Sequence, residues 1–501
     1  MSEGISTSDS SKKDFKSSLK TTGLFGGVQV YQILIRIVSS KFVAVLLGPV
    51  GMGINGLLQS TTQIISSVAG MGLGTSAVRD MSISYASKDE NRFFRTLSVF
   101  RTLVWYTGIF GALICLFGSP LWSKLSFGNY NYTLAFILIA VTVLFTQLNS
   151  GQTVLLQSTR NFKMMAKAGI IGSTIGLFVN IPMYYLWGIK GIVPAIITMS
   201  LATLVLSTYF AHKIPQKKIR LTVKETMYEG KSMLNMGFFL MLQGLLELVC
   251  GYIVRIYISN TGSIADVGLY NAGFAIINTY VGMVFTAMVT EYYPRLSSYA
   301  NDSKKFNQAI NQQIEISLLL TAPLIAFFLV FGDLAIILLY SNKFLPITWM
   351  VIWAMMAIFF RAPSNCTAFS FLAKGDTKAF WLNEMIAVVT QLFINLLFYH
   401  YKGLTGLGLS YLLNYFLYNI QVWIITKIRY QFKLDFRIIG VFIPQLLLSS
   451  AIILVFYFLG DIPRYVIGTL LAIASAYISY KMLSRYMDVK AFIFEKIHRN
   501  E

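Results

Sequence analysis

The sequence predicts an all-α integral membrane protein of about 14 transmembrane helices, with two six-helix lobes related by a pseudo-two-fold axis along the membrane normal and two further C-terminal helices. Three observations predict this fold. The 501-residue chain is 55% hydrophobic and only 12% charged, about half the charged fraction of a soluble domain. Apolar runs of roughly 20 residues, long enough to cross a bilayer, recur along almost the whole chain. Similar segments also return after about 215 residues.

Fourteen apolar runs, separated by polar or glycine- and proline-containing loops, define the predicted spans. Long continuous runs exclude a transmembrane β-barrel, whose strands are short and alternate between apolar and polar residues. The spans cover residues 22–47, 54–77, 97–118, 132–157, 168–187, 191–211, 233–258, 268–290, 309–331, 346–373, 380–399, 406–426, 438–459 and 465–483.

Charge sets the orientation of these spans, because cytoplasmic loops retain Lys and Arg. With the N-terminus inside, the inner loops and tails hold 32 of the 41 Lys and Arg residues and the outer loops hold five. Both termini are therefore predicted to be cytoplasmic. Basic loops beside anionic lipid also account for the net charge of +20, so we expect membrane lipids and no nucleic acid as partners. The polar N-terminal segment is not followed by a small-residue cleavage site, so no cleavable signal peptide is predicted.

Three pairs of segments match in the same order at nearly one offset, which predicts a duplicated unit. They are VGMGING (50–56) with VGLYNAG (267–273), SYASKD (84–89) with SYANDS (298–303), and GIKG (188–191) with GLTG (403–406). Each unit holds six spans, an even number, so both units enter from the same side, as in two-lobed transporters. The predicted parts are a polar tail (1–20), an N-terminal lobe (21–211), a basic cytoplasmic linker (212–232), a C-terminal lobe (233–426), two additional helices (437–485) and a cytoplasmic tail (486–501).

Four cations lie within predicted spans: Arg36, Lys41, Arg255 and Arg361. A charged side chain at the bilayer centre costs roughly 2.5–3.5 kcal/mol, so such residues usually face a cavity or a partner. The repeat pairs Lys41 with Arg255. Arg361 precedes Pro363, which is expected to bend or break its helix, and broken helices at the membrane midplane are typical of substrate sites. We predict that the four cations bind an anionic substrate.

Two carboxylates, Glu247 and Glu384, also lie within predicted spans. Carboxylates in spans couple transport to protons or sodium, or neutralise a neighbouring arginine. Two interpretations stay open for each buried charge. It either takes part in substrate binding or ion coupling, or it forms an ion pair that only orders the helices, and the two explain each single residue equally well. Four cations against two acids favour an anion as substrate.

Other chemistries have little support in the sequence. The three cysteines, Cys115, Cys250 and Cys366, lie within spans at spacings that suggest neither disulfides nor a metal site. The tyrosine-rich run YLLNYFLYN (411–419) is interpreted as interfacial or packing aromatics rather than a sugar-stacking surface. No enzyme motif and no cofactor are expected, apart from H⁺ or Na⁺ as coupling ion.

Three segments, FVAVLLGPVGMGI, VGLYNAGFAIINTYVGMVFTAMVTEYYPRLSSY and ILLYSNKF, resemble the Wzx-type flippases of the multidrug/oligosaccharidyl-lipid/polysaccharide exporter (MOP) superfamily. The resemblance covers about residues 20–427 and is strongest to O-antigen translocases and to flippases for the enterobacterial common antigen intermediate. Many Wzx flippases stop at twelve spans, whereas lipid II flippases have fourteen. The two additional spans therefore leave lipid II transport open.

The resemblance implies that an undecaprenyl-pyrophosphate-linked oligosaccharide moves from the inner to the outer leaflet of the bacterial inner membrane by alternating access. It implies a role in lipopolysaccharide or related polysaccharide biosynthesis, ion antiport, and a polysaccharide polymerase and chain-length regulator as partners. Lys41, Arg255 and Arg361 occupy positions where similar flippases carry basic residues, and Glu384 matches an acidic position of the family. Arg36 is predicted from its location alone. Arg36 and Lys41 are thus expected to serve a diphosphate.

Three alternatives remain. A drug exporter of the same superfamily is disfavoured because organic cations need an acidic cavity. A polysaccharide polymerase would need catalytic groups on a substantial outer loop, and the outer loops are short. An assembly scaffold would use the buried charges for helix pairing alone.

Overall fold

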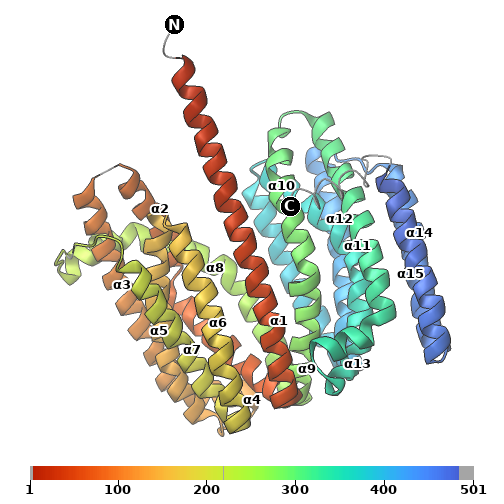
Figure 1. The fold of residues 1–501 in the computed structure, drawn as a ribbon, viewed down its shortest axis with the longest axis horizontal. Coiled ribbons are helices and arrows are strands. Elements are labelled where there is room, and N and C mark those ends of the chain that lie inside the picture. The colour runs from red at the N-terminus through yellow and green to blue at the C-terminus, as the bar shows by residue number, and fades with distance from the viewer. Residues whose placement is uncertain (1–3, 88, 218, 485–501) are drawn as a thin grey trace, which may run out of the picture. The chain divides into compact units, whose positions relative to one another are not determined.

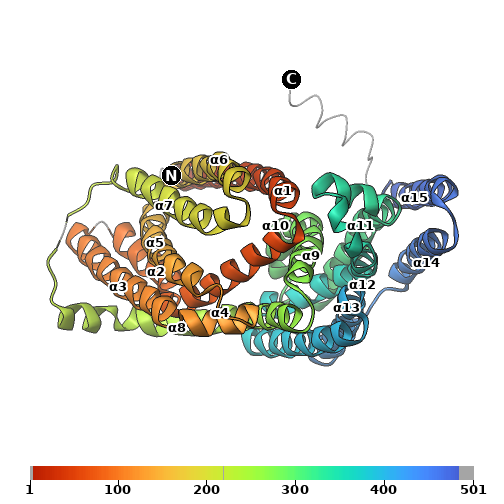
Figure 2. The same ribbon diagram turned by 90° about the horizontal axis from the view of Figure 1, so that it is seen from below.

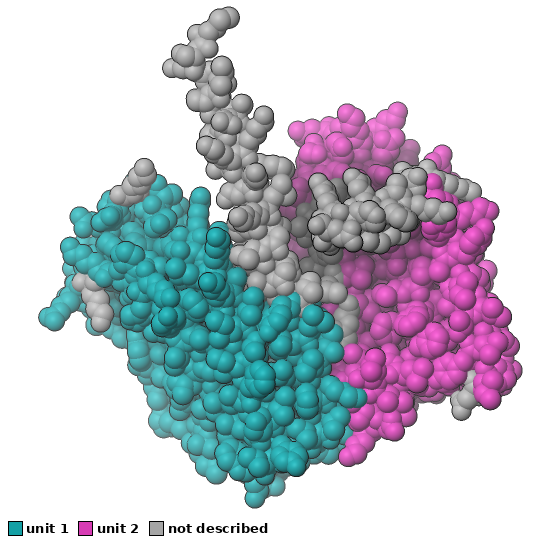
Figure 3. All heavy atoms as spheres, in the orientation of Figure 1, with its two compact units in different colours: residues 1–268 teal, residues 269–501 magenta. Residues whose placement is uncertain are grey.

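The computed structural model describes residues 4–87, 89–217 and 219–484, with side chains from residue 31 onward apart from several positions between 239 and 291 and residue 461. Every regular element among these residues is a helix (Figures 1 and 2). The chain divides into two compact units, unit 1 (Met1–Gly268) and unit 2 (Leu269–Glu501), which Figure 3 colours separately. The all-helical, two-lobed fold class is confirmed.

Unit 1 begins with α1, whose two segments meet at a kink. Gly48 interrupts the helix with φ 65° and is followed by Pro49, because glycine accepts a positive φ at no steric cost. The elements of unit 1 are α1 (Gly4–Gly70), α2 (Leu73–Ala86), α3 (Glu90–Phe117), α4 (Ser119–Phe127), α5 (Thr133–Ser158), α6 (Phe162–Trp187), η1 (Gly188–Gly191), α7 (Ile192–Ala211) and α8 (Val223–Thr261), with the start of α9 (Ile264–Ala275).

Unit 2 continues α9 through a π-helical turn, η2 (Ile276–Val281), into α10. In α13, Gly403 has φ 57° and joins two antiparallel segments. The remaining elements are α10 (Gly282–Ser298), α11 (Ser303–Leu339), η3 (Asn342–Ile347), α12 (Thr348–Ala373), α13 (Thr377–Tyr430), α14 (Phe436–Phe458) and α15 (Asp461–Leu483).

The predicted spans lie on these helices to within a residue or two at their ends, except that span 54–77 is interrupted at Met71 and Gly72, between α1 and α2. Among the described residues, nine helical stretches are long and apolar enough to cross a membrane. Phe162–Ala211 and Thr377–Tyr430 contain two predicted spans each, and Tyr31–Gly70 contains parts of spans 22–47 and 54–77. The seventh and eighth predicted spans lie on α8 and on α9 to α10. Within unit 1, α8 packs against α1, α2, α3 and α4.

The internal repeat is visible as two turns of the same geometry. Gly188 has φ 54° and ψ −132°, and Gly403 has φ 57° and ψ −139°. A Cβ on Gly191 would lie 2.3 Å from the carbonyl oxygen of Met183, and one on Gly406 would lie 2.0 Å from that of Phe398. The GIKG and GLTG segments therefore fold alike because both need the same glycines.

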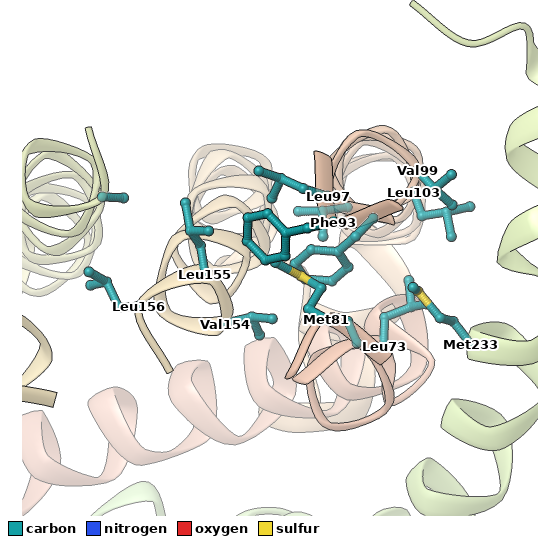
Figure 4. Packing of buried hydrophobic residues seen from close by; sticks show 14 of the residues in the cluster. Leu73, Met81, Phe93, Leu97, Val99, Leu103, Val154, Leu155, Leu156 and Met233 are labelled. Carbon is teal, nitrogen blue, oxygen red and sulfur yellow. The ribbon is translucent and has the colours of Figure 1, made fainter. Parts of the chain in front are cut away.

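The turn between α1 and α2, at residues 71 and 72, lies beside the hydrophobic core of unit 1 and is called the elbow. Leu73, Met81, Phe93 and Leu103 belong to one buried cluster from α2, α3, α5, α7 and α8 (Figure 4). At the elbow, Gly72 has φ 62°, and a Cβ there would lie 2.1 Å from the carbonyl oxygen of Gly237 on α8. The glycines of GMGLG (70–74) thus allow both a turn and a close backbone approach.

The last helix, α15, is joined to α11 by a largely buried ion pair. The guanidinium of Arg464 on α15 donates to Asp333 Oδ2 on α11 at 3.0 Å, and the side chains are 13% and 20% exposed. Thr348 Oγ1 donates to the other carboxylate oxygen at 2.6 Å. Asp333 therefore joins α11, α12 and α15.

Replacing Asp333 by asparagine is expected to destabilise the protein by about 2 kcal/mol, because a charge-assisted hydrogen bond is lost and the guanidinium keeps its desolvation cost. Unfolding of the purified protein will measure this. In a double-mutant cycle, Asp333→Asn will cost much less in a chain that already carries Arg464→Gln. Equal costs in both backgrounds would contradict the ion pair.

Candidate functional site

The most developed polar cluster in unit 2 surrounds Arg361, halfway along α12. Its Nη1 donates to Asn278 Oδ1 on η2 at 3.0 Å and to the Tyr411 hydroxyl on α13 at 2.9 Å. The same hydroxyl donates to Asn278 Oδ1 at 2.9 Å. The guanidinium lies 5.2 Å from the ring centre of Phe285 and 5.5 Å from that of Tyr415, so aromatic faces shield it on two sides.

This cluster has more donors than acceptors. Among the described side chains, no carboxylate forms an ion pair with Arg361. Arg361 Nε and Asn278 Nδ2 are buried and have no hydrogen-bond partner in the part of the chain that the structure describes. Buried donors without acceptors are costly, and both of these donors suit a ligand that carries acceptor oxygens and negative charge. The cluster therefore combines a positive charge with two unpaired buried donors.

A face of three tyrosines on α13 connects this cluster to Glu384. Tyr411, Tyr415 and Tyr418 follow one another with ring centres 4.8 and 6.3 Å apart. The Tyr418 hydroxyl donates to Glu384 Oε1 at 2.6 Å. Asn383 Nδ2 donates to the same carboxylate oxygen at 3.2 Å. Arg361 and Glu384 thus belong to one polar column, without a direct ion pair between them among the described contacts.

Pro363 does not break the helix that carries Arg361. The sequence predicted that this proline would bend or break the helix, and α12 continues from Thr348 to Ala373 without a non-helical residue. A proline removes one backbone donor, and α12 tolerates this loss because α11 and α13 pack against it. The irregular backbone at the site comes instead from the π-helical turn that carries Asn278, a feature found at many functional sites.

The remaining predicted residues, Arg36, Lys41, Arg255 and Glu247, lie in unit 1, whereas Arg361 and Glu384 lie in unit 2. Arg36 is exposed on α1 and lines a pocket with α6 and α7. Lys41, five residues further on, is half-buried and outside that lining. Arg255 is half-buried on α8, and its Nη1 donates to the carbonyl oxygen of Gly251 at 2.9 Å. Glu247 is exposed on the same helix.

Sequence reasoning missed Asn278 and underrated the tyrosines. The run at 411–419 was interpreted as packing, and Tyr411 and Tyr418 are indeed buried, being 4% and 8% exposed. Their hydroxyls, however, meet Arg361 and Glu384. Two signals were available: tyrosines at i, i+4 and i+7 share one helix face, and an asparagine within an apolar span usually has a polar partner.

Comparison with known proteins places the chain in a family. Residues 42–349 match the family model described as "Polysaccharide biosynthesis protein". The chain belongs to this polysaccharide biosynthesis family. No curated protein sequence matches it.

Solved structures show the fold of this polysaccharide biosynthesis protein. It is similar to "Lipid II flippase MurJ, inward closed conformation", with a TM-score of 0.69 at 14% identity over 93% of this chain and 99% of the other. It is also similar to an inward-facing multidrug resistance MATE family transporter of the MOP superfamily, with a TM-score of 0.67 at 17% identity over 80% of this chain and 94% of the other. The chain therefore shares the fold of these two solved structures.

Proposed function

We propose that this protein is a flippase. It moves an undecaprenyl-pyrophosphate-linked oligosaccharide, an O-antigen or related surface-polysaccharide repeat unit, from the inner to the outer leaflet of the bacterial inner membrane by alternating access. The observation that carries the proposal is the donor-rich site of Arg361, which suits a diphosphate. Membership of the polysaccharide biosynthesis family and the transporter fold support it.

The four cations Arg36, Lys41, Arg255 and Arg361 bind the polar head group in this proposal. Glu384 is the coupling residue, since its carboxylate joins Arg361 through the tyrosine face, and Glu247 is a second candidate. Proton or sodium antiport supplies the energy. A polysaccharide polymerase and a chain-length regulator then receive the translocated unit. A drug exporter fits less well, because organic cations are repelled by the Arg361 guanidinium, which forms no ion pair with a carboxylate among the described side chains.

The test is depletion of the protein in its native cell, followed by mass spectrometry of the lipid-linked oligosaccharides. An enzyme confined to the outside reports which leaflet holds them. We expect complete pyrophosphate-linked units to accumulate on the inner leaflet. Wild-type protein restores translocation, and Glu384→Gln or an ionophore that collapses the coupling gradient prevents it.

Other outcomes distinguish the rival functions. Complete units on the outer leaflet with failed polymer formation would overturn the flippase in favour of a polymerase or scaffold. Accumulation of lipid II instead would identify a different cargo for the same reaction. Translocation that ignores both the gradient and Glu384 would remove ion coupling from the proposal.

A further inference from the structure

A second polar pocket lies within unit 1, in the angle between α1, α6 and α7. Its volume is about 330 Å³. The polar groups that line it are Gln32, Arg36 and Ser39 from α1, Ser173 and Asn180 from α6, and Thr203 from α7. Small residues make the room: Gly172 lies on the α6 wall, where a Cβ would only just reach Thr203 at 3.5 Å.

All three walls of the pocket come from the middles of predicted spans. Arg36 stands near the centre of span 22–47, Ser173 and Asn180 lie inside span 168–187, and Thr203 lies inside span 191–211. Such a depth is costly for a guanidinium, roughly 2.5–3.5 kcal/mol at the bilayer centre. A cation there needs water or a ligand, and among the described side chains no carboxylate pairs with Arg36.

The mixture of donors and acceptors in this lining decides which ligand chemistry fits. The side-chain amides of Gln32 and Asn180 each carry a donor and an acceptor. Arg36 is a donor and needs an acceptor, and the hydroxyls of Ser39, Ser173 and Thr203 serve as either. A diphosphate offers acceptors alone, and an acyl chain offers neither. Sugar hydroxyls and acetamido groups offer both.

We propose that this Arg36 pocket is a carbohydrate subsite, which binds a sugar of the lipid-linked oligosaccharide while the donor-rich Arg361 site binds the diphosphate. The inference rests on the proposed function and deepens it. It refines the expectation that Arg36 serves the diphosphate, because the pocket around Arg36 also offers amides and hydroxyls that accept hydrogen bonds as well as donate them, whereas the two unpaired atoms at the Arg361 site are donors. Specificity for the sugar unit then resides in unit 1.

The test compares two probes on the purified full-length protein by native mass spectrometry. One is undecaprenyl diphosphate without sugar, and the other is the pool of polyprenyl-diphosphate oligosaccharides extracted from the native cell. Arg36→Gln and Gly172→Leu are expected to weaken binding of the sugar-bearing lipids about tenfold, the worth of one charge-assisted hydrogen bond, and to leave undecaprenyl diphosphate unaffected. Arg361→Gln will weaken both probes.

Two further variants act as controls. Arg36→Lys keeps the positive charge but not the guanidinium. It tests whether the charge alone restores part of the affinity for the sugar-bearing lipids that Arg36→Gln loses. Gly440→Leu makes the same change as Gly172→Leu at a membrane glycine on α14, where a Cβ has nothing within 4 Å, and will change neither affinity.

The outcomes separate this inference from the proposed function. If Arg36→Gln weakened both probes equally, the pocket would be a diphosphate site and the carbohydrate subsite would be refuted. Unchanged affinity for both probes in Arg36→Gln and Gly172→Leu would refute it as well, while the flippase proposal stood. A wild-type protein that bound neither probe would overturn the proposed function and this inference together.

Discussion

Arg361→Gln will lower the affinity for undecaprenyl diphosphate by about 10- to 100-fold and stop translocation, because the guanidinium supplies charge and donors to the diphosphate. Titration of the purified protein with undecaprenyl diphosphate, followed by native mass spectrometry, measures the affinity. Asn278→Asp is expected to have an equally large effect although it keeps the arginine. Asn278 Oδ1 lies 3.0 Å from Arg361 Nη1, so a carboxylate at this position forms an internal ion pair with the guanidinium and competes with the diphosphate.

The controls for this prediction share its chemistry but not its location. Arg437→Gln removes the same charge from an exposed position at the start of α14 and will leave the affinity unchanged. Tyr411→Phe removes one hydroxyl partner of Arg361 and is expected to have a smaller effect than the loss of the guanidinium. Wild-type affinity in a folded Arg361→Gln protein would show that the diphosphate binds elsewhere.

Gly72→Val is expected to cause the largest loss of stability. The residue has φ 62°, and its Cβ would lie 2.1 Å from the Gly237 carbonyl oxygen. A left-handed conformation costs an L-residue about 1–2 kcal/mol, and displacing the packed backbone of α8 adds about 1–3 kcal/mol. The yield of monodisperse protein and its melting temperature, measured by size-exclusion chromatography after heating, will both fall sharply.

Alanine variants at two glycines separate the cost of a positive φ from the cost of the steric clash with α8. Gly375 has φ 71° and nothing within 4 Å of a Cβ, so Gly375→Ala loses stability only through the unfavourable backbone conformation. Gly72→Ala loses stability through this conformation and through the clash with α8. Equal melting temperatures for the two alanine variants would mean that the close approach of the elbow to Gly237 does not exist in solution.

The membrane fold was accessible from the sequence because the bilayer acts on every span separately. A run such as 438–459 must be apolar wherever it packs, since lipid cannot hydrogen-bond a polar side chain or a free backbone group. Helices therefore appear where the hydropathy predicts them, including α14 for that run. The similarity of GIKG and GLTG was visible in the sequence for a similar reason, because Gly188 and Gly403 are each required by a positive φ in their own turn.

The candidate site was accessible only in part. Arg361 and Glu384 were predicted because a charge inside an apolar run is conspicuous. Their connection through Tyr411 and Tyr418 was not, because tyrosines in a span are ordinarily packing residues. Pro363 does not break α12, because the packing of neighbouring helices offsets the loss of one backbone hydrogen bond.

By itself, the sequence determined a polytopic helical membrane protein, most of its spans and the few charges that needed an explanation. Tertiary structure alone decided what those charges meet. Arg361 finds Asn278 and Tyr411, which lie 83 and 50 residues away in the chain, while Arg36 faces a pocket of unit 1. The physical reason is that hydropathy reports how a helix is solvated. The rotation of each helix about its axis, which aims its polar side chains, depends on packing against its neighbours.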